Sequence, residues 1–185
     1  GFPAEFSPKT TQKRIDASIV ETTVTATMPS GLRLTAACKE YRDFPVSEWI
    51  AEFTNNGDKD SPIVSDIVLG GGIAGDFRTF VHGNGDNLSD AGYEWWADEL
   101  NEPMELHPED GTSCNGAFPY MRLLGEGCGL NIAVGWPAMW QADFAPDGSG
   151  TRVVIGQKRC ATVLHPGETL RTPRATFMLY TGDED

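Results

Sequence analysis

The segment Tyr120–Phe144, YMRLLGEGCGLNIAVGWPAMWQADF, decides the fold class of this chain of 185 residues. It contains three short aliphatic or aromatic runs, Tyr120–Leu124, Leu130–Trp136 and Trp140–Phe144. Side chains that alternate in character along such short runs are typical of strands that bury one face. Glu126-Gly127, between the first two runs, predicts a tight hairpin turn. The segment therefore predicts antiparallel strands.

The same pattern continues on both sides of this segment. Ile15–Met28 and Leu32–Ala36 flank the turn Pro29-Ser30-Gly31 and predict a hairpin, and Asp147-Gly148 predicts another tight turn. Many short strands with regular turns predict an all-β fold, a large antiparallel β-sandwich. We expect one domain over residues 1–185, with residues 1–14 as an extended N-terminal arm. The residues expected in the buried layer are Trp49, Phe53, Leu130, Ile132 and Val134.

One stretch interrupts the alternation. Gly83–Gly116 shows little periodicity and is predicted to form one long irregular loop, with a short helix at Ser89–Leu100. Long ordered loops in compact domains often carry function.

The charge of the chain restricts the classes of partner that it can bind. The formal net charge is −13 and the sequence pI is about 4.5. A phosphate backbone or an anionic membrane surface would repel such a chain, so we expect neither nucleic acid nor membrane as a partner. A neutral glycan is compatible with this charge, and the acidity also fits a role in solubility alone. No long apolar run predicts a transmembrane helix. The compartment stays open between extracellular and cytoplasmic, because the chain starts at Gly1 without a leader.

The cysteines and histidines do not have the spacing of a metal site. No CxxC pair occurs and the three histidines are scattered, so no zinc site is expected. Cys114 and Cys128 flank one predicted strand and are the favoured disulfide under oxidising conditions. Four free thiols, with Cys38 and Cys160 as the other two, fit the sequence equally well. No cofactor is expected. Structural calcium is conceivable around Asp143, Asp147 or Asp86, although none of these has a regular ligand spacing.

No catalytic arrangement is recognisable. The sequence contains no GxSxG, P-loop or HExxH motif. Asp86, Asp90, Glu94 and Asp98 could supply the two facing carboxyl groups of a glycosidase, but a solvated acidic loop is the favoured interpretation.

Aromatic residues beside polar ones are the most suggestive feature. An indole offers a flat apolar face to the C–H face of a sugar ring, and neighbouring carboxylates and amides bind its hydroxyls. The alternatives are that these indoles fill the edge of the sandwich and that the histidine only anchors a turn. The predicted ligand site lies at one edge of the sandwich and contains His82, Asn84, Asp86, Trp95 and Trp96, with Trp136 as a further candidate.

Several segments, in order, resemble the N-terminal domain of α-galactosidase-type glycoside hydrolases of family 36. The residues that carry the resemblance are Tyr41–Trp49 (YRDFPVSEW), Phe80–Gly83 (FVHG), Gly111–Met121 (GTSCNGAFPYM), Gly129–Phe144 (GLNIAVGWPAMWQADF) and Leu164–Arg174 (LHPGETLRTPR). They are similar to the family's "DFPxxEW", "hxxG", "GxSS…PYF", "GxxxAIGWxGQW" and "LxPGExxxTP" segments. The similarity covers roughly residues 31 to 181.

The resemblance implies a supersandwich-like domain that precedes a (β/α)₈ barrel carrying two catalytic aspartates. Those aspartates have no counterpart here, and the tetramer-forming loop of some members is not recognisable, so we expect no catalysis by this chain alone. The first hypothesis is a non-catalytic domain that docks on the barrel and borders its sugar pocket. The second is an autonomous module that binds neutral glycans, galactose-containing ones among them, through loop tryptophans.

Overall fold

The computed structural model describes residues 7–86, 90–148 and 150–182, and the regular elements in these ranges are all β-strands. The strands pair antiparallel in each of the three sheets. The predicted all-β class is confirmed. The strands are β1 (Lys9–Arg14), β2 (Ile19–Thr27), β3 (Leu32–Tyr41), β4 (Val46–Asn55), β5 (Val64–Ser65), β6 (Val68–Ala74), β7 (Thr79–Gly83), β8 (Trp95–Glu99), β9 (Met104–Leu106), β10 (Tyr120–Gly125), β11 (Cys128–Gly135), β12 (Trp140–Pro146), β13 (Thr151–Gln157), β14 (Ala161–Thr162), β15 (Thr169–Arg171) and β16 (Arg174–Thr181).

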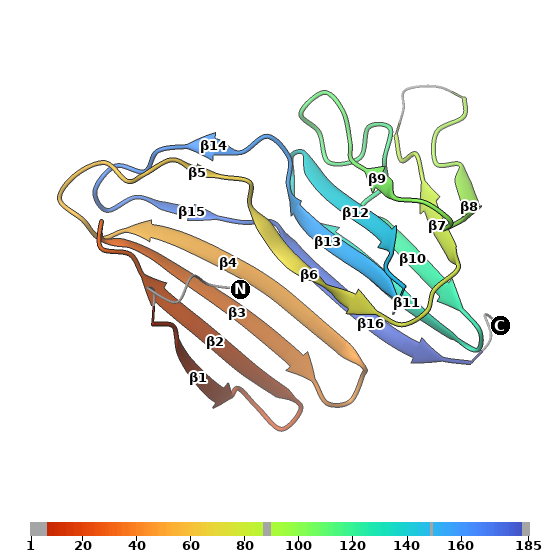
Figure 1. Ribbon diagram of the computed structural model, residues 1–185, viewed down its shortest axis with the longest axis horizontal. Coiled ribbons are helices and arrows are strands. Elements are labelled where there is room, and N and C mark those ends of the chain that lie inside the picture. Colours follow the sequence, from red (N-terminus) through yellow and green to blue (C-terminus); the bar gives the residue numbers. More distant parts are fainter. Residues whose placement is uncertain (1–6, 87–89, 149, 183–185) are drawn as a thin grey trace.

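Two sheets of unequal size form the sandwich. The large sheet has ten strands in the order β1-β2-β3-β4-β16-β11-β10-β7-β8, with β15 beside β4. The small sheet has the order β6-β13-β12-β9, and β14 pairs with β5. In Figure 1 the small sheet lies across the half of the large sheet that contains β16, β11, β10 and β7, whereas β1 to β4 extend beyond it. This arrangement confirms the predicted large antiparallel sandwich.

The main core fills the space between the two sheets. Leu130, Ile132 and Val134 alternate along β11 and are buried, as predicted. Across the layer, the Phe80 ring on β7 contacts the Phe144 ring on β12, with 4.4 Å between ring centroids. The fully buried side chains of this core include Phe80, Met121, Leu123, Ile132, Trp140, Phe144 and Ile155.

The predicted hairpins are present. β2 and β3 pair along their length on either side of the Pro29-Ser30-Gly31 turn. β10 and β11 close at Gly125 opposite Cys128, and Gly127 in their turn has φ +64°, in the left-handed region that glycine adopts without strain. Asp147-Gly148 likewise lies between the paired strands β12 and β13.

The prediction that Trp49 is a core residue is wrong. Trp49 shares a face with the fully buried Ala175 of β16, but its exposed fraction is 38 %. The reason is that β4 lies at the margin of the area that the small sheet covers (Figure 1). Phe53, further along β4, is partly buried and belongs to a second cluster with Leu32, Val64, Ile67 and Leu164.

The predictions of a single long loop and of a short helix within it are also wrong. The stretch Gly83–Gly116 includes β8 and β9, and β8 extends the large sheet by pairing with β7. Residues 95 to 99, predicted as helix, are therefore extended, while Ser89 falls outside the described residues. Aromatic residues fit a pleated strand well, and pairing with β7 overrides the weak helical pattern. At the other end of the sheet, Lys9–Arg14 of the expected N-terminal arm form the edge strand β1 on β2.

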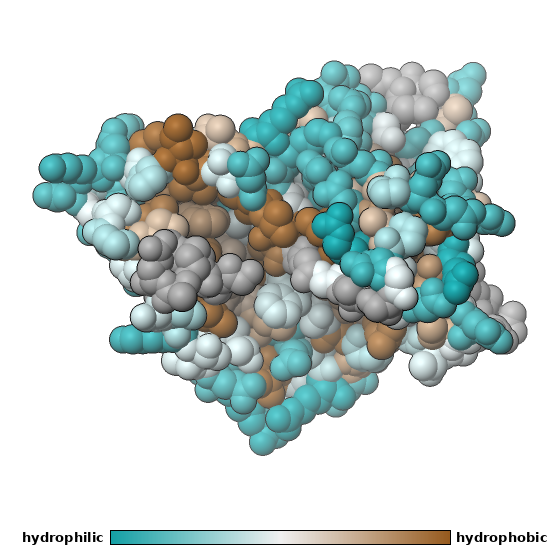
Figure 2. Space-filling view, viewed as in Figure 1, coloured by the Kyte–Doolittle hydropathy of each residue, from teal (hydrophilic) through white to brown (hydrophobic). Residues whose placement is uncertain are grey.

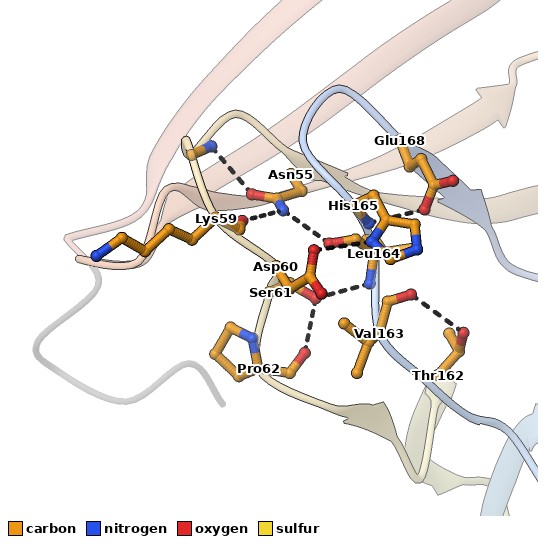
Figure 3. Close-up of polar contacts among 11 residues, drawn as sticks. Asn55, Lys59, Asp60, Ser61, Pro62, Thr162, Val163, Leu164, His165 and Glu168 are labelled. Atoms are coloured by element: carbon orange, nitrogen blue, oxygen red, sulfur yellow. Dashed lines mark hydrogen bonds and ion pairs between the residues drawn. The ribbon is translucent and has the colours of Figure 1, made fainter.

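A buried polar junction ties β4 to the segment before β15, as Figure 3 shows. Asn55 is fully buried, and its Nδ2 donates to the carbonyl oxygens of Lys59 at 2.8 Å and Leu164 at 2.7 Å. Its Oδ1 accepts from the Gly57 backbone N at 3.0 Å. Leu164 N donates to Ser61 Oγ at 2.9 Å. The Leu164–Arg174 segment singled out by sequence thus begins at a structural junction.

The four cysteines are free thiols in the structure, which is the alternative that the sequence left open beside a Cys114–Cys128 disulfide. Burial, and secondarily the charge of Glu40, raise the pKa of Cys38 to about 11. Among the elements described, no helix is long and apolar enough to cross a bilayer.

Candidate functional site

The predicted site centres on β8, the edge strand of the large sheet. Trp95 lies opposite Gly83 of β7, and Trp96 lies opposite His82. Successive side chains of a strand point to opposite faces, so the two indoles face opposite sides of the sheet. Their exposed fractions are 49 % for Trp95 and 42 % for Trp96. Two different surfaces therefore present an indole to solvent.

The first surface is the edge cluster, formed by His82, Trp96 and Asp98. His82 Nε2 and Asp98 Oδ2 are 2.9 Å apart. The imidazole is stacked on the core residue Phe80, with ring centroids 4.8 Å apart, and its centroid is 5.7 Å from that of Trp96. Phe80 on one side and the Asp98 carboxylate on the other fix the imidazole. The cluster combines an exposed indole with a charged hydrogen-bonding group, which suits a sugar hydroxyl beside a stacked ring.

Asn84 and Asp86 lie on the loop that follows β7. Asn84 is buried, and its Nδ2 donates to the Ala91 carbonyl at 2.6 Å, while its Oδ1 is buried without a hydrogen bond. Asp86 N donates to the Cys114 carbonyl at 2.9 Å. Gly85 between them has φ +60°, and a Cβ there would lie 2.2 Å from the Cys114 carbonyl oxygen. The side chain of Asn84 therefore anchors this loop, rather than presenting its amide at the surface.

Trp136 is not brought to the same place. It follows β11, which β10 and β7 separate from β8, a distance of about 14 Å at the usual strand spacing of ~4.8 Å. The indole packs partly against the main core, and the Arg171 guanidinium carbon lies 5.5 Å from its ring centroid. Its Nε1 is buried without a hydrogen-bond partner. Trp136 therefore belongs to the margin of the core, and not to the edge cluster.

The second surface is a groove on the outer face of the large sheet, which we call the outer groove. Its volume is about 620 Å³. The sequence-based predictions do not include this groove, although Tyr120 alternates with the buried Met121 and Leu123 and is therefore expected to point outward. Its outward-facing lining side chains include Val46, Trp95, Tyr120, Ala133, Thr176 and Met178.

The part of the chain that the structure describes contains no group of three or more His, Cys, Asp or Glu side chains that could hold a metal ion. Gln141 Nε2 donates to both carboxylate oxygens of Asp143 at 3.1 Å. Of the four carboxylates considered for glycosidase chemistry, Asp98 is engaged by His82, and Asp90 and Glu94 are exposed. This geometry adds no support for structural calcium or for a catalytic carboxyl pair.

Neither a protein-family model nor a curated protein matches the sequence. Several solved structures match this chain. An α-galactosidase from Lactobacillus brevis aligns over 96 % of this chain and 26 % of its own, with TM-score 0.74 and 14 % identity. A GH36 α-galactosidase from Geobacillus stearothermophilus, in complex with raffinose, aligns over 95 % and 27 %, with TM-score 0.76 and 16 % identity. This chain has the fold of a domain of GH36 α-galactosidases.

The chain spans about a quarter of the length of these α-galactosidases. The resemblance found in the ordered sequence segments is thus confirmed at the level of the fold. The fold is not confined to glycosidase structures. A TPR-domain containing protein from Parabacteroides distasonis aligns over 96 % of this chain and 35 % of its own, with TM-score 0.52 and 10 % identity.

Proposed function

We propose that this chain works as a non-catalytic domain of an α-galactosidase-like glycoside hydrolase, docking on a (β/α)₈ catalytic barrel and bordering its sugar pocket. One observation carries the proposal: nearly the whole chain aligns with about a quarter of two GH36 α-galactosidases. The β-strand architecture of residues 7–86, 90–148 and 150–182 leaves the barrel to the remaining three quarters of such an enzyme.

A bare apolar patch supports docking. Ile63 and Val163 come next to the last paired residues of β5 and β14, Val64 and Thr162, and Val68 begins β6. Their exposed fractions are 69 % for Ile63, 38 % for Val163 and 62 % for Val68. Figure 2 shows apolar side chains gathered on the face of the molecule that carries these strands. Exposed apolar patches on a domain mark surfaces that another domain covers.

The proposal is tested first by reading the coding sequence downstream of Asp185, where we expect a (β/α)₈ barrel. That barrel is then expressed with and without residues 1–185, and the thermal midpoint and the hydrolysis of an aryl α-galactoside are compared. We expect both to fall without this domain. Ile63→Asp in the complete protein should reproduce part of the loss, because it places a charge in the docked patch.

Phe44→Asp is the matched control, since Phe44 is 66 % exposed on the turn between β3 and β4, away from the patch. It should leave both measurements near wild type. A downstream sequence without a barrel, or a barrel indifferent to residues 1–185, contradicts the proposal.

The second candidate function is an autonomous module that recognises neutral glycans through its tryptophans. The observation that favours it is the exposure of an indole on each face of β8, one of them beside the His82–Asp98 pair. The test is to replace Trp95 and Trp96 by Ala separately and to screen both variants against galactosides and plant polysaccharides. At least one variant should lose affinity while its thermal midpoint stays close to wild type. Two variants that only unfold more easily, with recognition intact, contradict this function.

A further inference from the structure

The rings of Trp95 and Tyr120 form one wall of the outer groove, a preformed aromatic platform. A Cβ built on Gly83 would lie 3.1 Å from Cδ2 of Trp95, so the indole lies across the bare glycine backbone of the neighbouring strand. One side of the indole is thereby occupied, while 49 % of Trp95 stays exposed. Phe118 packs against both rings of the platform. Its ring centroid is 5.5 Å from that of Trp95 and 5.3 Å from that of Tyr120.

Strand register places small and polar side chains on the floor. Ala133 of β11 lies opposite Thr176 of β16, in one row across the sheet. In the adjacent outward-facing row, Asn131 lies opposite Met178, which in turn pairs with Val46 of β4. The short side chains of Ala133 and Thr176 keep the floor low, and Val46 and Met178 bound the groove on the side away from Trp95. Asn131 and Thr176 supply hydrogen-bonding groups beside the aromatic wall.

Size and charge define the class of ligand. The groove volume of about 620 Å³ falls within the ~300–1,000 Å³ of small-molecule sites. Arg122 is the one charged side chain among its described lining residues, and the chain as a whole carries a net charge of −13. An acidic ligand would meet the repulsion of the whole molecule, whereas a neutral one would not.

We propose that the outer groove binds a neutral oligosaccharide, with the apolar face of one sugar ring stacked on Trp95 and a ring further along the ligand hydrogen-bonded by Asn131 and Thr176. This inference rests on the second candidate function and assigns it to one face of β8. Sugar rings suit this surface because they combine apolar C–H faces with hydroxyls at their rims, as the groove combines flat rings with an amide and a hydroxyl. The edge cluster, whose three residues do not line the outer groove, is left out of the site.

The experiment titrates the chain with raffinose, and in parallel with a galactomannan oligosaccharide, by calorimetry and by tryptophan fluorescence. Trp95→Ala and Tyr120→Ala each remove one ring of the wall. Trp96→Ala is the matched control, because it removes the neighbouring indole of the same strand from the opposite face. We expect saturable millimolar binding by wild type to at least one probe, and a loss of affinity of tenfold or more in the Trp95 and Tyr120 variants only. Thermal midpoints report folding, and Trp95→Tyr, which keeps a ring on Gly83, should recover part of the affinity.

The outcomes separate this inference from the function it rests on. Affinity lost in Trp96→Ala but kept in Trp95→Ala moves the glycan to the edge cluster, which overturns the groove and leaves glycan recognition standing. No saturable binding of either probe by wild type overturns both. If tryptophan fluorescence instead changes on adding a catalytic domain to wild type but not to Trp95→Ala, and neither sugar binds, the groove is a domain interface and the sugar proposal fails.

Discussion

Asn55 Nδ2 and the carbonyl oxygen of Leu164 are joined by a hydrogen bond of 2.7 Å, between residues 109 positions apart in the chain. The bond is buried, and the same amide also holds Lys59 and Gly57. When a buried carbonyl loses its hydrogen-bond donor, the free energy of removing that carbonyl from water is no longer offset. This one side chain therefore secures the end of β4 against the segment that leads into β15.

Asn55→Ala is expected to destabilise the domain by about 2–4 kcal/mol, because two carbonyls and one backbone N–H lose their partner inside the protein. The free energy of unfolding from urea titration measures the change. Asn56→Ala is the control: the neighbouring residue is exposed, so its loss should stay within about 0.5 kcal/mol. Equal effects of the two substitutions would show that the Asn55 network contributes little.

Ile132→Ala should cost about 2–5 kcal/mol, since Ile132 is 1 % exposed in the middle of the main core and its truncation leaves a cavity. Leu179→Ala removes an aliphatic side chain of the same size from β16, the strand next to β11, but Leu179 is 51 % exposed. We expect its effect to be a small fraction of the Ile132 value. Unfolding titrations of both variants, run together, compare them directly, and similar losses would contradict the assigned packing.

The stability of the junction should depend on pH through His165. The hydrogen bond between His165 Nδ1 and Asp60 Oδ1, 2.7 Å long, raises the pKa of His165 above its ordinary value of 6.5, with the charges of Asp60 and Glu168 adding to the effect. A raised folded-state pKa stabilises the protein fully below pH 6.5, and this contribution is lost as pH rises through the folded pKa.

Asp60→Asn should bring the pKa of His165 down and lower the urea midpoint at pH 6 more than at pH 8. NMR titration of the His165 ring measures the pKa, and the urea midpoints at the two pH values measure the linkage. A His165 pKa unchanged by the substitution would contradict the pairing. Because the pair is exposed, added salt should weaken the effect.

The thiol of Cys38 should react slowly with alkylating reagents. Its pKa of about 11 leaves on the order of 10⁻³ of the group as thiolate at pH 8, and the thiolate is the reactive form. Alkylation of Cys38 by iodoacetamide, followed by peptide mass spectrometry, should therefore accelerate about tenfold for each pH unit between 8 and 10. Rapid, pH-independent labelling of Cys38 in the folded protein would contradict its burial.

The isolated chain should not hydrolyse an aryl α-galactoside. Retaining and inverting glycosidases both need two carboxyl groups facing the sugar. This chain aligns with only about a quarter of the GH36 α-galactosidases, which leaves out the barrel on which the family resemblance places the two catalytic aspartates. Nitrophenol release by the contaminant-free protein is the measurement, with an intact α-galactosidase as the positive control. Activity that copurifies with the chain and disappears in Asp98→Asn would refute the expectation.

Much of the fold could be predicted because its signals are local. The alternation of Leu130, Ile132 and Val134 identifies the buried face of β11 without knowledge of the partner strands. Gly127, with φ +64°, supplies the turn that joins β10 to β11. Two of the ordered segments that resemble GH36 enzymes coincide with β11 and β12 and with the junction at Leu164.

The errors have a common physical origin. Trp49 has the alternation of a core residue, but burial also requires a second layer, and the small sheet covers only part of the large one. The segment Trp95–Glu99 has no decisive local preference, and its strand exists because β7 offers an edge to pair with.

The sequence by itself determined that Trp95 and Trp96 point to opposite faces once they lie in a strand, because side chains alternate with a period of two. It also determined the all-β class and the turns. Only the tertiary structure decided that Trp96 meets His82 and Asp98, that Trp95 meets Gly83, Phe118 and the outer groove, and that Trp136 meets Arg171 elsewhere. These neighbours come from strands distant in the chain, and no local pattern specifies which strands pair.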